Sequence, residues 1–198
     1  MVGFYTSGWP CYKGDEIVSR VAERLPEYRF VVAGQRYLFP DEKLPGNMER
    51  MGQLTDMKPF YEQISVLLVP SIVGEGCPRV ILEAAVNGIP VIANSVGGIP
   101  EALGRSGIMV DAGPGGYNDV DTVAGKYVVI LRKLLEDRER YEFERQRAFI
   151  RAGEYQREQD EQITRLQSMF GEAVSVTARL VAGSSSELDH RASGQSCT

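Results

Sequence analysis

The chain contains little histidine, cysteine and tryptophan. Its 198 residues include one histidine, three cysteines and one tryptophan. The histidine, His190, lies in a polar stretch near the C-terminus, which argues against catalysis by a histidine acid or base. Cys11, Cys77 and Cys197 are far apart and odd in number, so they match neither a disulfide framework nor a metal-binding pattern. We therefore expect a protein of the reducing cytoplasm that holds no metal.

A long apolar run and an excess of basic residues are also missing. No run approaches the roughly 18 apolar residues that a membrane-spanning helix needs. Met1 is not followed by a basic and then apolar leader. The net charge is −5, and basic residues alternate with glutamate over residues 132–165 instead of forming a patch. We therefore expect no nucleic-acid partner.

The chain does contain short apolar runs that alternate with amphipathic helices. Strands are expected at residues 2–5, 28–34, 51–54, 66–70, 90–93 and 107–110, with helices between them at about 14–25, 57–63, 79–87 and 99–103. Because the strands are continuous apolar runs separated by helices, we expect an α/β fold, with a parallel sheet covered by helices on both faces.

The C-terminal part has a different composition. Helices are expected at about 120–137, 139–151 and 154–170, and small polar residues dominate after residue 182. We therefore expect a sheet-containing domain over residues 1–152 and a C-terminal helical extension over residues 153–181. A disordered polar tail is expected over residues 182–198.

The stretch from Gly74 to Ala85 joins two of the apolar strands. It places Glu75 in a loop and Glu83 eight positions later in a helix. Eight residues are little more than two helical turns, so a loop folded back beside its helix would bring both carboxylates to one crevice. Carboxylates accept hydrogen bonds from sugar and ribose hydroxyls, and the free amides at a helix start favour a phosphate. The stretch is therefore typical of a nucleotide-sugar site.

Four groups of residues occur in an order and at a spacing that match a known family. They are Lys13-Gly14, Glu75 through Glu83, Gly88 through Ala93, and Gly97 through Glu101. On these residues the chain resembles the C-terminal, donor-binding half of the retaining glycosyltransferases of family four, which have the two-domain GT-B architecture. The resemblance covers roughly residues 1–150 and implies a Rossmann-like sheet, one half of a GT-B fold.

The resemblance also implies the activity and the site. The reaction would be transfer of a sugar from a nucleotide-diphosphate sugar with retention, without a cofactor or metal. Glu75 and Lys13 would be the catalytic residues, Glu75 on the donor sugar and Lys13 near the diphosphate. Glu83 would bind the ribose. The other donor-binding residues would be Gly76, Cys77, Arg79 and Val80 beside the phosphate or sugar, and Met51 and Gly52 beside the base.

The implied partners are the nucleotide sugar and an acceptor-binding half that this chain does not contain. In the family that half is an N-terminal domain, so the chain would be either a fragment or one of two polypeptides. Any peripheral association with a membrane would involve only the missing half.

Two positions depart from the family pattern. The family commonly has an arginine about five residues before the lysine, whereas residues 6–9 contain no basic group. Either stabilisation of the leaving group would be poorer, or another residue such as Arg79 would substitute. Pro78 stands where glycine is frequent, and a proline has no amide to donate. Two alternatives therefore stay open: a non-catalytic nucleotide-sugar binding module or regulatory subunit, and a nucleotide-sugar epimerase or phosphorylase-like enzyme.

Overall fold

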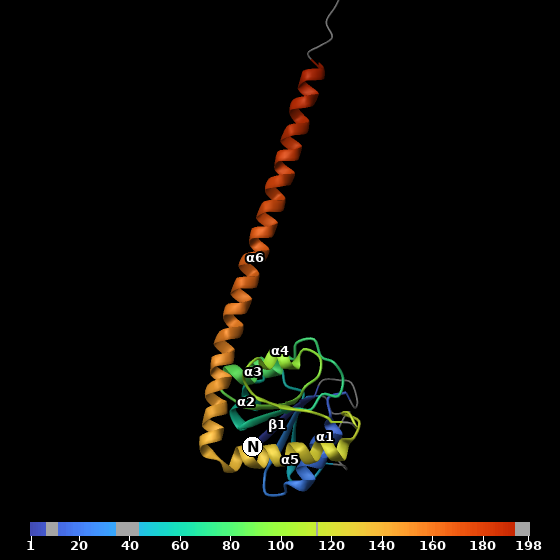
Figure 1. Ribbon diagram of the computed structural model, residues 1–198, viewed down its shortest axis with the longest axis vertical. Helices are drawn as coiled ribbons and strands as arrows, with labels where there is room; N and C mark the ends of the chain where they lie inside the picture. Colours follow the sequence, from blue (N-terminus) through green and yellow to red (C-terminus); the bar gives the residue numbers. More distant parts are fainter. Residues whose placement is uncertain (7–11, 35–43, 114, 193–198) are drawn as a thin grey trace, which may run out of the picture. The chain divides into compact units, whose positions relative to one another are not determined.

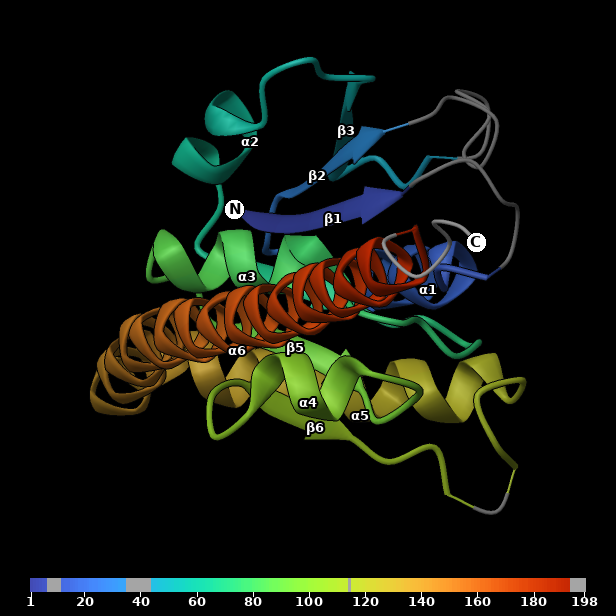
Figure 2. The ribbon, with the colours of Figure 1, turned by 90° about the horizontal axis from the view of Figure 1, so that it is seen from above.

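The computed structural model describes residues 1–6, 12–34, 44–113 and 115–192 (Figure 1). The strands form one six-stranded sheet in the order β3-β2-β1-β4-β5-β6, and every paired neighbour is parallel. Figure 2 shows the same order from β3 through β2 and β1 to β5 and β6. The bounds are β1 Val2–Thr6, β2 Phe30–Gly34, β3 Met48–Gly52, β4 Val66–Val69, β5 Val91–Asn94 and β6 Ile108–Val110.

Helices cover both faces of this sheet. They are α1 Asp15–Arg24, α2 Lys58–Gln63, α3 Arg79–Val86, α4 Ile99–Leu103 and α5 Val120–Glu136. Helices α1 and α5 pack on one face, and α2, α3 and α4 pack on the other (Figure 1). Successive strand residues point to opposite faces of the sheet. Phe30 and Val32 therefore lie in a first core, between the sheet and helices α1 and α5. Val31 and Ala33 lie in a second core, between the sheet and helices α2, α3 and α4. The predicted α/β fold with a Rossmann-like parallel sheet is confirmed.

Helix α6 differs from the sequence-based expectation. It runs over Arg138–Ala192 as one helix, in place of separate helices at 139–151 and 154–170. Residues 138–192 contain no proline, and each of the three glycines, Gly153, Gly171 and Gly183, lowers helix stability by only about 1 kcal/mol relative to alanine. The helix also continues through residues 182–192, which were expected to be disordered, because each residue added to a formed helix gains a hydrogen bond. Residues 193–198 of the expected tail lie outside the described residues.

The chain divides into two compact units, Met1–Gly153 and Glu154–Thr198. The first unit contains the whole sheet and helices α1 to α5. In the second unit, α6 exposes several large apolar side chains, namely Ile163, Leu166, Met169 and Phe170. Within the described residues, no helix is both long and apolar enough to cross a bilayer.

Candidate functional site

A cavity of about 290 Å³ opens at the carboxyl ends of β1 and β4. These two strands are neighbours in the sheet although two other strands separate them in sequence, so the strand order reverses between them. In doubly wound sheets, ligands bind in the crevice that forms at this reversal. The lining residues are Phe4, Tyr5, Lys13, Met57, Leu68, Val69, Ser71, Glu75, Cys77, Pro78, Arg79, Val80 and Glu83.

Glu75 lies in the loop after β4 and is fixed from three sides. Lys13 Nζ lies 2.5 Å from one carboxylate oxygen, and the Ser71 hydroxyl donates to the other. The backbone amide of Gly98 donates to the Glu75 carbonyl at 2.6 Å. With a side chain that is 14% exposed, Glu75 keeps one edge at the cavity while protein groups hold the rest.

Lys13 reaches the cavity because of the glycine that follows it. Gly14 has a φ of 77°, a left-handed conformation that favours glycine. A side chain at this position would collide with the carbonyl of Pro70, just after β4. The turn therefore packs directly against the end of β4, which brings the Lys13 ammonium to Glu75.

Glu83 lies in α3, whose apolar residues pack in the second core. The Tyr61 hydroxyl of α2 donates to Glu83 Oε2 at 2.7 Å, and it is the one donor to this carboxylate recorded among the described residues. Burial, and then the hydrogen bond to Glu83, raise the pKa of Tyr61 far above its ordinary value. Tyr61 therefore stays protonated and orients the carboxylate while leaving its other oxygen open.

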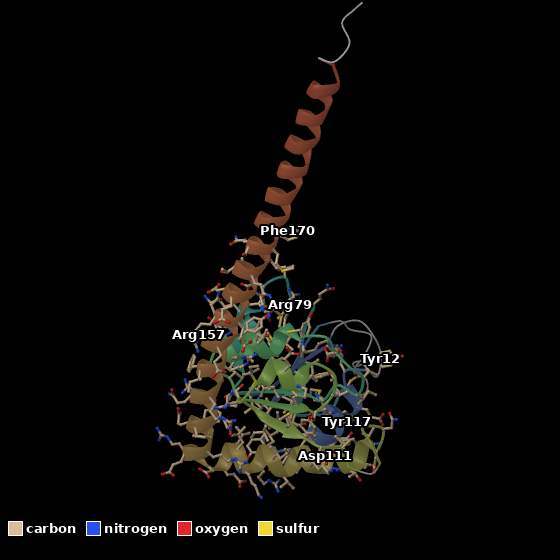
Figure 3. All side chains as sticks on the ribbon, turned by 45° about the horizontal axis from the view of Figure 1, so that its top comes forward. Tyr12, Arg79, Asp111, Tyr117, Arg157 and Phe170 are labelled. Atoms are coloured by element: carbon tan, nitrogen blue, oxygen red, sulfur yellow. The ribbon has the colours of Figure 1, made fainter. Side chains whose placement is uncertain are left out.

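The start of α3 also lines the cavity. Pro78 precedes the helix. Arg79, labelled in Figure 3, is the first residue of the helix. Cys77 is exposed beside them. Arg79 and Lys13 both line the cavity, so two cationic side chains face a site with two carboxylates. The cations suit a diphosphate and the carboxylates suit hydroxyl groups.

The structure brings together most of the residues singled out from the sequence, and not all of them. Glu75, Lys13, Glu83, Cys77, Arg79 and Val80 line the cavity. Gly76, Met51 and Gly52 do not, because Gly76 packs its carbonyl against Gly98 and the other two end β3, beyond β2 in the sheet. The position of the missing arginine, about five residues before Lys13, lies outside the described residues.

Sequence reasoning missed Ser71, Met57 and Tyr61. Ser71 carried a usable signal, since it is a polar residue just after a buried strand, at the end where ligands bind. Tyr61 carried none, because its bond to Glu83 joins two helices that are 22 residues apart. Among the described residues, no group of three or more acidic, histidine or cysteine side chains is placed to hold a metal.

Comparison with known protein families shows to which family the chain belongs. A family model described as glycosyl transferases group 1 matches residues 12–133, which is more than half of the chain. The chain belongs to the glycosyl transferases group 1. A curated relative, the sulfoquinovosyl transferase SQD2 of Arabidopsis thaliana, is 32% identical over 137 residues. The match covers 64% of this chain and 25% of that protein, so the chain spans about a quarter of the length of this relative.

Solved structures of other glycosyltransferases share the fold. HepE of Anabaena in complex with UDP and glucose matches with a TM-score of 0.64 and 19% identity over 84% of this chain and 47% of its own. The sucrose-phosphate synthase of Thermosynechococcus elongatus matches with a TM-score of 0.61 and 22% identity, over 84% and 45%. The C-terminal domain of the group 1 protein LpcC of Francisella tularensis matches with a TM-score of 0.61 and 19% identity, over 77% and 84%.

Proposed function

We propose that this chain is the donor-binding domain of a retaining glycosyltransferase that uses a nucleotide-diphosphate sugar. The observation that carries the proposal is the meeting of Glu75, Glu83 and Lys13 in one cavity at the strand reversal, in a member of the glycosyl transferases group 1. The UDP and glucose found with HepE support this class of donor. Family membership favours transfer over epimerisation, and retention rests on the resemblance of the motifs.

Each side chain then has a task that fits its chemistry. Glu83 accepts hydrogen bonds from the ribose, and Glu75 accepts them from the sugar. Lys13 and Arg79 face the diphosphate. As the bond from the sugar to the diphosphate breaks, negative charge grows on the leaving group, and fixed cations stabilise it there. We therefore expect the cations of this chain to replace a metal at the diphosphate.

The acceptor belongs to another part of the enzyme in this proposal. We assign it to an N-terminal domain or a separate subunit, since the chain covers less than half of HepE. A non-catalytic binding module is the second candidate, favoured by the absence of a basic group at residues 6–9. It would bind the donor equally well and release no nucleoside diphosphate when an acceptor-binding half is added.

The experiment is a calorimetric titration of the 198-residue chain with UDP, GDP and ADP. We expect saturable binding of one of them, and a loss of about tenfold or more in Glu83→Gln, since a hydrogen bond to a charged group contributes about 1.5–3 kcal/mol. Glu101→Gln is the control, because Glu101 is an exposed carboxylate of α4 outside the cavity. The proposal is wrong if no nucleotide binds, or if Glu83→Gln binds as tightly as the unaltered chain.

A further inference from the structure

A line of buried hydrogen bonds connects helix α5 to Glu75. The Tyr127 hydroxyl donates to Asn94 Oδ1 at 2.9 Å, and Asn94 Nδ2 donates to the Ser71 carbonyl at 3.0 Å. The Ser71 hydroxyl then donates to a carboxylate oxygen of Glu75. Tyr127 and Asn94 are 0% exposed and Ser71 is 1% exposed. The line therefore passes through the protein interior and ends at the cavity.

We propose that Tyr127 is a positioning residue, which fixes the Glu75 carboxylate for the donor sugar through Asn94 and Ser71. This inference rests on the proposed function of Glu75. It adds a residue of the apolar core to the donor site, although no atom of Tyr127 lines the cavity.

The direction of every bond in this line is fixed by chemistry. The Ser71 carbonyl can only accept, so Asn94 must turn its NH₂ toward Ser71 and its oxygen toward Tyr127. The oxygen of Asn94 then requires a donor, and the Tyr127 hydroxyl is that donor. Burial raises the pKa of Tyr127 well above its ordinary value, so the hydroxyl keeps its proton. A single arrangement of the amide therefore satisfies both ends.

The position of Asn94 shows why this matters for Glu75. Val69 of β4 pairs with Ala93 of β5, and Asn94 follows directly. Its bond to Ser71 ties the loop that leaves β4 to the neighbouring strand. Four residues later the same loop carries Glu75, whose carbonyl is held by the amide of Gly98. The loop is thus held at Ser71 by the last residue of β5 and at Glu75 by Gly98, four residues further along the chain.

If packing were the only requirement, apolar side chains at positions 94 and 127 would be less costly to bury than Asn94 and Tyr127. Asn94 ends a strand whose other residues are apolar, and Tyr127 lies in the core formed by α1, α5 and the sheet. Burying an amide and a hydroxyl in such surroundings is unfavourable unless both are hydrogen-bonded. Without the Tyr127 hydroxyl, the Asn94 oxygen would lack its donor and the amide would be free to turn away from Ser71.

The chain offers a matched control at the opposite end of β4. The Tyr141 hydroxyl donates to the Ser65 carbonyl at 3.0 Å, and Ser65 directly precedes β4. Tyr141→Phe and Tyr127→Phe therefore remove the same atom and the same kind of bond. Only Tyr127 is connected to the Glu75 loop.

The first test compares the affinity of the chain for UDP with its affinity for UDP-glucose. The same comparison is made between GDP and a GDP-sugar, and between ADP and an ADP-sugar. A hydrogen bond lost from the positioning line corresponds to about threefold to tenfold in affinity. We expect Tyr127→Phe to lower the affinity for the sugar conjugate by this factor more than it lowers the affinity for the free nucleotide. Glu75→Gln should show the same selectivity, and Tyr141→Phe should show none.

The variants separate the two ways of failing. If Glu75→Gln weakens both ligands equally, the assignment of Glu75 to the sugar is wrong. If Glu75→Gln is selective and Tyr127→Phe behaves like Tyr141→Phe, the positioning role is wrong and the proposed function stands.

A second test needs no ligand. Amide hydrogen exchange reports the bond from Gly98 to the Glu75 carbonyl, and the bond from the Ser65 amide to the Met1 carbonyl at 2.7 Å serves as reference. We expect Tyr127→Phe to speed exchange at Gly98 relative to Ser65, by about threefold to tenfold. Equal acceleration at both amides would mean a general loss of stability and would overturn the positioning role.

Discussion

The two ends of the sheet bury different kinds of residue. At the carboxyl ends, Thr6 closes β1, Asn94 closes β5 and Ser71 follows β4, and each is at most 1% exposed. At the amino ends, strands β1 to β5 begin with buried apolar residues, namely Val2, Phe30, Met48, Val66 and Val91. Buried polar groups are unfavourable without partners, so their concentration at one end needs a reason. For two of them the cavity at that end supplies one, since Ser71 lines it and Asn94 donates a hydrogen bond to Ser71.

Lys13→Met tests the comparison most strongly. Lys13 lies at the carboxyl ends of the strands and faces the cavity. Its loss should therefore lower the affinity for a nucleoside diphosphate by about tenfold or more, as expected for a charge-assisted hydrogen bond. The free nucleoside should bind nearly as before. The measurement is a pair of dissociation constants by calorimetry, for the diphosphate and for the nucleoside.

Arg29→Met is the matched control at the amino end, where Arg29 precedes β2 and pairs with Glu49 at 3.0 Å. It should leave both constants unchanged. Equal losses of nucleoside and diphosphate in Lys13→Met would remove Lys13 from the phosphate site.

Tyr61→Phe sharpens the comparison at a hydrogen bond whose donor is uncharged. Removing the hydroxyl frees Glu83, so nucleotide affinity should fall by about threefold to tenfold. A 2′-deoxynucleotide offers Glu83 fewer hydroxyls, and its affinity should fall less. The measurement is the ratio of the dissociation constants for the nucleotide and the 2′-deoxynucleotide, in the unaltered chain and in Tyr61→Phe. An unchanged ratio would argue against the assignment of Glu83 to the ribose.

Glu144→Gln tests a buried charge that lies outside the cavity. Glu144 of α6 is 6% exposed. Burial raises the pKa of this carboxyl, although the nearby Arg147 and Arg140 act to lower it. The folded protein therefore holds the proton more tightly than the unfolded chain, and stability falls as pH rises from the ordinary glutamate range through the raised pKa.

Glutamine cannot ionise, so the stability of Glu144→Gln relative to the unaltered chain should increase over that pH window and then level off. The difference should be on the order of 1 kcal/mol, as for most single substitutions. Denaturant unfolding at several pH values measures it, and nucleotide affinity should not change. A change in affinity would show that polar burial outside the carboxyl ends also serves the site.

The order of strands and helices was predictable because hydrophobic periodicity is a local property. The strand expected at 66–70 is observed at Val66–Val69, and the helix expected at 79–87 at Arg79–Val86. The strand expected at 51–54 begins earlier, at Met48, because an edge strand tolerates charged residues such as Glu49 and Arg50.

The hydrogen-bond partners within the site were not predictable in the same way. Tyr127 lies on the apolar side of its helix, and nothing in the apolar pattern of that helix indicates a bond to a residue 33 positions away. Such a bond depends on how α5 packs on β5. The two carboxylates were found because they lie on one local stretch. The hydroxyls that hold them come from a strand end and from another helix.

Each carboxylate of the site is already held by a protein hydroxyl, Glu75 by Ser71 and Glu83 by Tyr61. A side chain that is ordered on binding loses rotational entropy worth about 0.5–1.5 kcal/mol, and here that ordering takes place when the protein folds. Donor affinity is therefore partly a property of the folded core. Substitutions that loosen either hydroxyl should appear first as a less favourable binding entropy, while the thermal stability of the domain is still intact.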